Sequence, residues 1–286
     1  CSTVKQDSRL INIHAGFNFL KTCPKQPPVK YNVSNFALME FSFEALILIA
    51  VVFLLAAFIH GSIGFGFPMV ATPLLALFTD IQTAIVLTLI PTLLVNLISI
   101  ISEGNILVAA RRHFLLALFA MLGSAVGTQI LLTVNSDIFK GLLGVVIIIY
   151  LFSEKIKLKY SWIREQPKFS KCTFGLSAGI LGGLTNVMAP VLIIYSLESK
   201  YSKSETVQAS NLCFLLGKII QIFLFFINDK FSLNEFSTFS AMLLVTLIAL
   251  YGGIAVRNKI KGKAYKKILR LLLFILAIML LIQVSI

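Results

Sequence analysis

Charged residues are scarce in this sequence. Asp, Glu, Lys and Arg make up 13% of the 286 residues, against about a quarter in an average soluble domain. Hydrophobic residues make up 58%, and the mean hydropathy is +0.92. This composition excludes an ordinary soluble domain and indicates an integral membrane protein.

Apolar stretches close to the roughly 20 residues that a bilayer-spanning helix needs recur along the chain. They lie at 45–66, 82–101, 113–134, 138–153, 172–197, 206–227, 236–256 and 265–284. We therefore predict an all-α polytopic membrane protein with about eight hydrophobic helices, because a helix satisfies its own backbone polar groups in lipid.

Acidic residues are missing from all of these stretches, and Glu40, Glu44 and Asp80 lie at their edges or in loops. Catalysis inside a bilayer needs acid, base or nucleophile clusters, or a metal held by His and carboxylates. A nucleotide-binding G-x-x-x-x-G-K-[ST] loop is missing as well. The sequence therefore predicts neither an enzyme nor an ATP-driven pump, with no catalytic residue, no cofactor and no metal.

Cysteine is also rare, and the four cysteines are Cys1, Cys23, Cys172 and Cys213. The last two stand alone within apolar stretches, where cysteine usually behaves as a small hydrophobic residue. Neither a disulfide framework nor a metal site is predicted from them.

The first 38 residues lack a long apolar run and contain a cluster of prolines. The chain opens with Cys1, and its first methionine is Met39. We expect translation to begin at Met39, which would make residues 1–38 an upstream extension without a fold. A genuine cytosolic tail is the alternative.

Lys and Arg give a net charge of +13, and they gather between the apolar stretches, at 154–171, at 257–267 and at Arg111 and Arg112. This is the positive-inside pattern of cytoplasmic loops. A nucleic-acid-binding protein would carry its basic patch on a polar domain, and the sequence has none. The expected partners are the lipid bilayer and a small solute, with no nucleic acid and with a homo-oligomer left open.

An internal repeat divides the chain. GFPMVATPLL in the first half matches GLTNVMAPVL in the second, which pairs Gly66 with Gly183 and Pro73 with Pro190. We predict two transmembrane repeats, 39–153 and 172–286, joined by a basic cytoplasmic linker at 154–171. Secondary transporters commonly consist of such repeats, with the substrate site between them.

The basic loops test the topology. If every apolar stretch crossed the membrane, 154–171 and 257–267 would lie on opposite faces, against the positive-inside rule. A broken, re-entrant 172–197 places both loops in the cytoplasm, and a matching break at 61–68 inverts the second repeat relative to the first. Simple crossing stays the alternative, because 45–66 is long enough to span the bilayer.

The motif pair, the segment IHGSIGFGFPMVATPLL, the apolar stretches and the basic linker together resemble the TauE/SafE family of membrane permeases, often called the sulfite exporter family. The resemblance covers Met39 to Ile286. It implies a permease that moves sulfite, sulfonates or other small organosulfur anions across the cytoplasmic membrane. The second repeat departs from the glycine-rich pattern at Asn186 and Met188, which bears on the substrate more than on the fold.

The glycines and prolines of the two motifs predict helices that break inside the membrane. Such breaks are tolerated where protein or a water-filled cavity surrounds them, and a helix N-terminus attracts an anion. Pro68 suits the first position of the resumed helix, and Thr185 or Asn186 would cap its counterpart. The predicted substrate-binding residues of the breaks are Gly64, Gly66, Pro68, Pro73, Gly182, Gly183, Thr185, Asn186 and Pro190. Helix packing is the alternative for such residues, and it is what we expect for Gly123 and Gly127.

Lys218 lies near the middle of a predicted membrane helix, with no acidic residue in any membrane stretch to pair with it. Because an ammonium there costs about 2.5 to 3.5 kcal/mol, we predict that it faces the translocation pathway and binds the anion. Snorkelling toward a helix end or capping of backbone carbonyls are the alternatives. Gln208, Ser210 and Asn211 are further candidate ligand contacts, with hydrogen bonds between helices as the alternative. His60 is a candidate for proton coupling or for a structural hydrogen bond.

We therefore expect a multi-pass permease of a bacterial inner membrane that moves small anions by secondary transport and alternating access. A structural or assembly protein of the membrane, or an intramembrane enzyme, is the alternative.

Overall fold

A computed structural model describes residues 43–134, 137–153, 162–230, 236–257 and 262–285. Throughout these residues the regular secondary structure is helical, which confirms the predicted all-α class. The helices are α1 (Phe43–Ile63), α2 (Phe67–Ala76), α3 (Ile81–Ser102), α4 (Ile106–Thr133), α5 (Asp137–Ser153), α6 (Trp162–Glu165), α7 (Pro167–Thr185), α8 (Ala189–Glu198), α9 (Lys203–Ile227), α10 (Phe236–Val256) and α11 (Gly262–Ser285). The predicted extension 1–38 lies outside the described residues.

The bundle is apolar on its outside and carries polar side chains within. Exposed residues of α1 include Ile47, Val51 and Leu54, whereas His60 and Lys218 are fully buried. α1, α3, α4 and α9 are each long and apolar enough to cross a membrane. A lipid environment accounts for this distribution, because outward apolar side chains need no cover there.

Each half of the chain contains a long helix that is followed, after a short break, by a short one. α1 ends at Ile63 and α2 begins at Phe67, while α7 ends at Thr185 and α8 begins at Ala189. α2 and α8 have ten residues each. They are about 15 Å long, which is too short for a hydrocarbon core of roughly 30 Å. The apolar stretch 172–197 is therefore two helices, and the first of them begins at Pro167, inside the predicted linker.

The two halves can be aligned on their helix boundaries. Three pairs of equivalent residues have the same spacing in the sequence. The first pair is a glycine and an asparagine with positive φ at the two breaks, the second is the prolines at the second position of the short helices, and the third is the caps of the following long helices. The pairs are Gly64 (φ 104) with Asn186 (φ 66), Pro68 with Pro190, and Asp80 with Ser202.

This alignment corrects two sequence predictions. Pro190 matches Pro68 rather than Pro73, so the register read from the motifs, including the pairing of Gly66 with Gly183, is wrong. Pro68 occupies the second position of α2, after Phe67, and not the first. The error arises because the first motif contains two prolines, Pro68 and Pro73, and similarity alone does not show which of them corresponds to Pro190.

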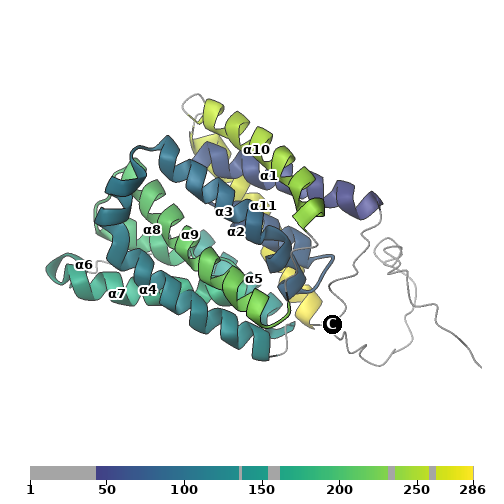
Figure 1. Cartoon of the computed structure of the whole chain (residues 1–286), viewed down its shortest axis with the longest axis horizontal. Helices are drawn as coiled ribbons and strands as arrows, with labels where there is room; N and C mark the ends of the chain where they lie inside the picture. Colours follow the sequence, from purple (N-terminus) through teal and green to yellow (C-terminus); the bar gives the residue numbers. More distant parts are fainter. Residues whose placement is uncertain (1–42, 135–136, 154–161, 231–235, 258–261, 286) are drawn as a thin grey trace, which may run out of the picture.

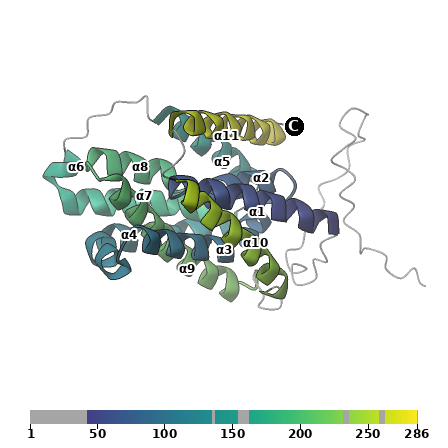
Figure 2. The same ribbon diagram turned by 90° about the horizontal axis from the view of Figure 1, so that it is seen from above.

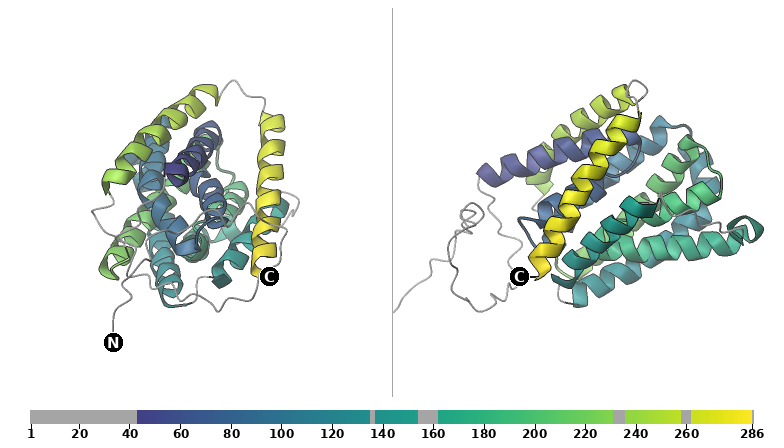
Figure 3. Two further views of the ribbon diagram at one scale, coloured as in Figure 1. Left: turned by 90° about the vertical axis from the view of Figure 1, so that its right-hand side faces the viewer. Right: turned by 180° about the vertical axis from the view of Figure 1, so that it is seen from behind.

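The helices of one half pack against those of the other in reciprocal pairs. α4 packs against α7, and α10 packs against α1, at opposite sides of the bundle (Figure 1). α5 contacts α8 and α11 contacts α2, while α11 also lies along α5 (Figures 2 and 3). α3 packs against α9. If each helix is replaced by its equivalent in the other half, for example α1 by α7 and α4 by α10, nearly the same set of contacting pairs results.

Glycine allows the closest of these approaches. A Cβ atom at Gly127 of α4 would lie less than 3.0 Å from the Ile180 carbonyl oxygen of α7, and one at Gly253 of α10 equally close to the Phe58 carbonyl oxygen of α1. Gly123 likewise meets the backbone of α7. The packing role predicted for Gly123 and Gly127 is confirmed.

The first helices of the two halves run in opposite directions. Asn211, in the first half of α9, bonds to Gly64 just beyond the end of α1, whereas Gln221, near the other end of α9, bonds to Gly183 near the end of α7. α1 is therefore antiparallel to α9, and α7 is parallel to it. The orientation of the halves relative to a bilayer stays a prediction.

One end of the bundle collects basic residues, and we call it the basic end. There α3 and α10 end and α4, α7 and α9 begin, since Glu103 pairs with Arg257 and its carbonyl oxygen accepts a hydrogen bond from Ser204. It lies on the left in Figure 1. Its basic residues are Arg111, Arg112, Arg164, Lys168, Lys171, Lys200, Lys203 and Arg257.

Candidate functional site

The first break, between α1 and α2, is built around His60. The Phe67 N–H donates to His60 Nδ1 at 3.0 Å, and His60 Nε2 lies 2.9 Å from Ser99 Oγ. Because Nδ1 accepts, Nε2 carries the proton and donates to Ser99. His60 thus caps the first free N–H of α2 as a neutral imidazole. This is the structural alternative of the sequence analysis, and a role in proton coupling stays a prediction.

The second break, between α7 and α8, is built around Asn186. Its Nδ2 donates to the hydroxyls of Thr72, at 2.7 Å, and Thr88, at 2.8 Å, while its Oδ1 is buried without a partner. Asn186 follows the last residue of α7 and does not cap α8, and Thr185 belongs to α7. The capping role predicted for either residue is therefore wrong: the residue before α8 is Met188, which offers no side-chain cap.

Each break is held by the opposite half of the chain. Asn211 of α9 donates to the Gly64 carbonyl oxygen at 2.6 Å, and Asn186 donates to α2 and α3. Val207 of α9 also packs against Gly64, which leaves no room for a Cβ there. The breaks are therefore contact points between the two halves.

Lys218 is fully buried in α9. Its ammonium donates to Oε1 of Gln221, whose Nε2 donates in turn to the Gly183 carbonyl oxygen at 3.3 Å. The ion pairs of the described residues are Arg112 with Glu205 and Arg257 with Glu103, so Lys218 has no carboxylate partner among them. An ammonium has three donors, and the structure gives this one a single neutral acceptor.

A buried polar stripe runs along α3 and has a counterpart on α9. Thr88, Thr92, Asn96 and Ser99 follow one another at the same spacing as Ser210, Phe214, Lys218 and Gln221, and all eight are buried. The two helices pack together. Of the polar stripe residues, Thr92, Asn96 and Ser210 have buried side-chain atoms without a hydrogen-bond partner. Such atoms are rare in native structures and need a partner such as water or a ligand.

The remaining predicted residues are divided between packing and the breaks. Gly183 packs on the backbone of α4, and Gly182 packs on Met188. Pro73 is buried inside α2. Gln208 is half-buried beside Gly104 at the basic end. Among the described residues, no group of three His, Cys, Asp or Glu side chains is placed to hold a metal ion.

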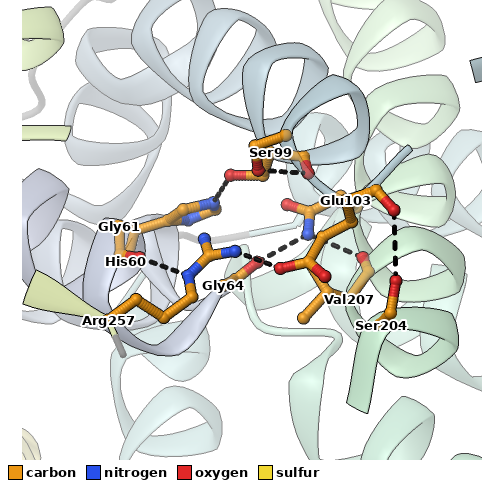
Figure 4. A network of polar contacts seen from close by, with 10 residues as sticks. His60, Gly61, Gly64, Ser99, Glu103, Ser204, Val207 and Arg257 are labelled. Atoms are coloured by element: carbon orange, nitrogen blue, oxygen red, sulfur yellow. Dashed lines mark hydrogen bonds and ion pairs between the residues drawn. The ribbon is translucent and has the colours of Figure 1, made fainter. Parts of the chain in front are cut away.

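A polar cluster that the sequence analysis did not identify closes the basic end (Figure 4). Arg257 donates from Nε to the Gly61 carbonyl oxygen at 2.8 Å and pairs through its guanidinium with Glu103. These contacts join α1, α3 and the end of α10. The sequence shows Arg257 only as a charge in a basic loop, because its own segment gives no sign of partners as distant as Gly61 and Glu103.

The family model described as Sulfite exporter TauE/SafE matches residues 48–280, which include both breaks and both polar stripes. No curated protein and no solved structure matches the chain.

Proposed function

The chain belongs to the sulfite exporter TauE/SafE family, and we propose that it moves a small sulfur oxyanion, such as sulfite or an organic sulfonate, between its two halves. The family is one of membrane permeases, which supports a transport role for this chain rather than a catalytic one. Substrate, site and mechanism are the parts that we propose.

The observation that carries the proposal is the environment of Lys218. An ammonium buried in a membrane protein needs a compensating partner, since desolvation of an unpaired charge is costly. Gln221 supplies one neutral acceptor, and no described acidic residue pairs with the ammonium. A mobile anion would supply the missing charge. Asn96 and Thr92 on the partner helix offer polar atoms that could contact its oxygens.

The stripes also suggest a charge for the substrate. Where α3 carries the neutral Asn96, the aligned position of α9 carries Lys218. The pair of stripes therefore presents one positive charge, which suits a monovalent anion. Neutral donors and acceptors then orient its oxygens, as in other small-molecule sites.

Alternating access is the mechanism that the packing favours. The halves contact one another in reciprocal pairs, and each break is bonded to the other half. Rocking of one half against the other would change both breaks together and expose the stripes to each side in turn. We further propose that the basic end faces the cytoplasm of a bacterial inner membrane.

The experiment is uptake of radiolabelled sulfite into liposomes that contain the purified full chain, with sulfonates, sulfate and thiosulfate as competitors. Lys218→Ala should abolish saturable flux, and Lys218→Arg should retain part of it because the charge remains. Lys203→Ala is the matched control, since Lys203 is an exposed lysine of the same helix. Its flux should equal that of the wild type.

Two results would overturn the proposal. Unchanged flux in Lys218→Ala would remove Lys218 from the pathway while leaving transport intact. Absence of flux for every anion, in folded wild-type protein, would refute transport of this substrate class.

A further inference from the structure

His113 is a buried titratable residue outside the proposed pathway. It lies in the first half of α4, its ring is fully buried, and neither ring nitrogen has a hydrogen-bond partner. A neutral imidazole has one donor and one acceptor nitrogen. Leaving both unpaired in the interior is unfavourable, so the site requires a partner that the described side chains do not supply.

Two tyrosines stand beside His113. The Tyr201 ring lies edge-on to the imidazole, with ring centroids 5.3 Å apart, and the Tyr195 and Tyr201 rings are 5.7 Å apart. Their hydroxyl oxygens are 3.5 Å from each other. Burial and the Tyr195 hydroxyl raise the pKa of Tyr201. Its hydroxyl therefore stays protonated at neutral pH and can donate a hydrogen bond to an anion.

The surrounding charges favour a negative ligand. Arg112, Lys171 and Glu205, from α4, α7 and α9, act electrostatically on His113. Arg112 and Glu205 form an ion pair with each other, whereas Lys171 forms no ion pair with a described residue. One positive charge is left over. Along α9, Glu205 is roughly 20 Å from Lys218 at about 1.5 Å per residue, so this cluster is separate from the polar stripes.

We propose that His113, Tyr195 and Tyr201 form a second binding site, for a small monovalent oxyanion, at which anion binding and protonation of His113 occur together. The proton comes from bulk water. An imidazolium has two donors and a positive charge, and a buried positive charge needs a counter-ion. Anion and proton therefore strengthen each other's binding by the same factor. Choosing a sulfonate as the anion rests on the proposed function, whereas the site itself does not depend on Lys218.

Trp162 provides a readout. It is the only tryptophan of the chain, and its ring centroid is 5.9 Å from Phe174, which is 5.5 Å from Tyr195. The purified full chain is titrated with sodium methanesulfonate at pH 6 and pH 8 and constant ionic strength, while tryptophan fluorescence is recorded. Methanesulfonate stays a monoanion at both values, so any pH dependence belongs to the protein.

We expect a saturable fluorescence change with tighter binding at pH 6, by up to about ten-fold for each pH unit. His113→Gln should remove the pH dependence, and Tyr201→Phe should weaken binding several-fold at both pH values. Lys218→Ala should titrate like the wild type although it loses flux, which separates this site from the transport pathway.

The inference is wrong if folded wild-type protein shows no saturable fluorescence change. That result is expected if water alone forms the hydrogen bonds to His113. It is also wrong if His113→Gln titrates like the wild type at both pH values. Should His113→Gln fail to fold, wild-type binding by Tyr201→Phe would refute the site equally. If the protein transports anions but shows no fluorescence titration, the proposed function stands and the second site is refuted. If it shows the fluorescence titration but no flux, the second site stands and the proposed function is refuted.

Discussion

Gln221 is the hydrogen-bond partner that lets the Lys218 ammonium stay inside the bundle, and it is a neutral one. A neutral acceptor does not cancel the positive charge, so the anion site that we propose at Lys218 would keep its attraction for an anion. Gln221 in turn bonds to Gly183, beside the second break. The charge, its acceptor and the break therefore form one connected unit.

Lys218→Met tests whether the charge serves function or stability. Methionine has a similar length and no charge, so it removes the desolvation cost of a buried ammonium without leaving a large cavity. We expect an unchanged or higher apparent Tm in detergent, together with loss of anion flux. Lys218→Ala is the comparison, because truncating a large buried side chain leaves a cavity and should lower the Tm. A Tm for Lys218→Met as low as that of Lys218→Ala would show a structural role.

Residues that stand out chemically are the ones the sequence identifies. Lys218 is a cation in an apolar stretch, and Asn186 departs from a glycine-rich motif, so both attract attention without a structure. Gln221 and Ser99 do not, because a lone neutral polar residue in a membrane helix more often bonds to a neighbouring helix. Aligning the halves on Pro68 and Pro190, rather than on overall similarity, would have placed both residues on the stripes.

At the scale of elements, the segments and their breaks were predictable and the register was not. Long apolar stretches indicate helices by length alone, and glycine with proline marks an interruption. The register becomes visible only from the helix boundaries and from contacts between the halves, such as the hydrogen bond from Asn211 to Gly64. Those contacts join residues far apart in the chain, and a local motif contains no information about them.

Adjacent glycines of α10 give a matched test of the helix packing. A Cβ atom at Gly253 would overlap the backbone of α1, whereas one at Gly252 would meet only the Phe58 ring, at 3.9 Å. Gly253→Ala should force α1 and α10 apart and destabilise the protein by about 1 to 3 kcal/mol. Gly252→Ala should be neutral or stabilising by up to about 1 kcal/mol, since alanine favours helix.

Thermal unfolding of both variants in the same detergent checks this pair. Equal apparent Tm values would contradict the close approach of α1 and α10. A lowered Tm in both would mean instead that α10 has no tolerance for added volume on either face.

Two features describe the whole molecule. The two halves make equivalent helix contacts, and the basic residues lie mainly at one end of the bundle. The reciprocal contacts make the halves alike, while the collection of Lys and Arg at one end makes the ends different. A transporter needs both properties. In the alternating access that we propose, similar halves would give two conformations of comparable energy, and unlike ends would fix the orientation of the protein in the membrane.

Cysteine labelling in cells tests the orientation that follows. In a chain whose Cys1, Cys23, Cys172 and Cys213 are replaced by Ser, a single cysteine is introduced at Arg164 or Lys203 of the basic end, or at Lys140 or Asp229 of the other end. A membrane-impermeant thiol reagent is added to intact bacterial spheroplasts and to inside-out vesicles. The positive-inside rule predicts that the basic end is cytoplasmic. Arg164→Cys and Lys203→Cys should therefore react only in inside-out vesicles, and Lys140→Cys and Asp229→Cys only in spheroplasts.

Arg164 and Lys203 distinguish a re-entrant segment from a crossing one, because α7 and α8 lie between them in the chain. If 172–197 crossed the membrane once as a continuous helix, these two positions would be labelled from opposite sides. Labelling from the same side requires that α7 and α8 together enter and return, which is the re-entrant arrangement that the short α8 and the break at Asn186 favour. Labelling of Lys203→Cys and Asp229→Cys from one side would mean that α9 does not cross the membrane. In that case the placement of Lys218 inside the membrane would be wrong as well.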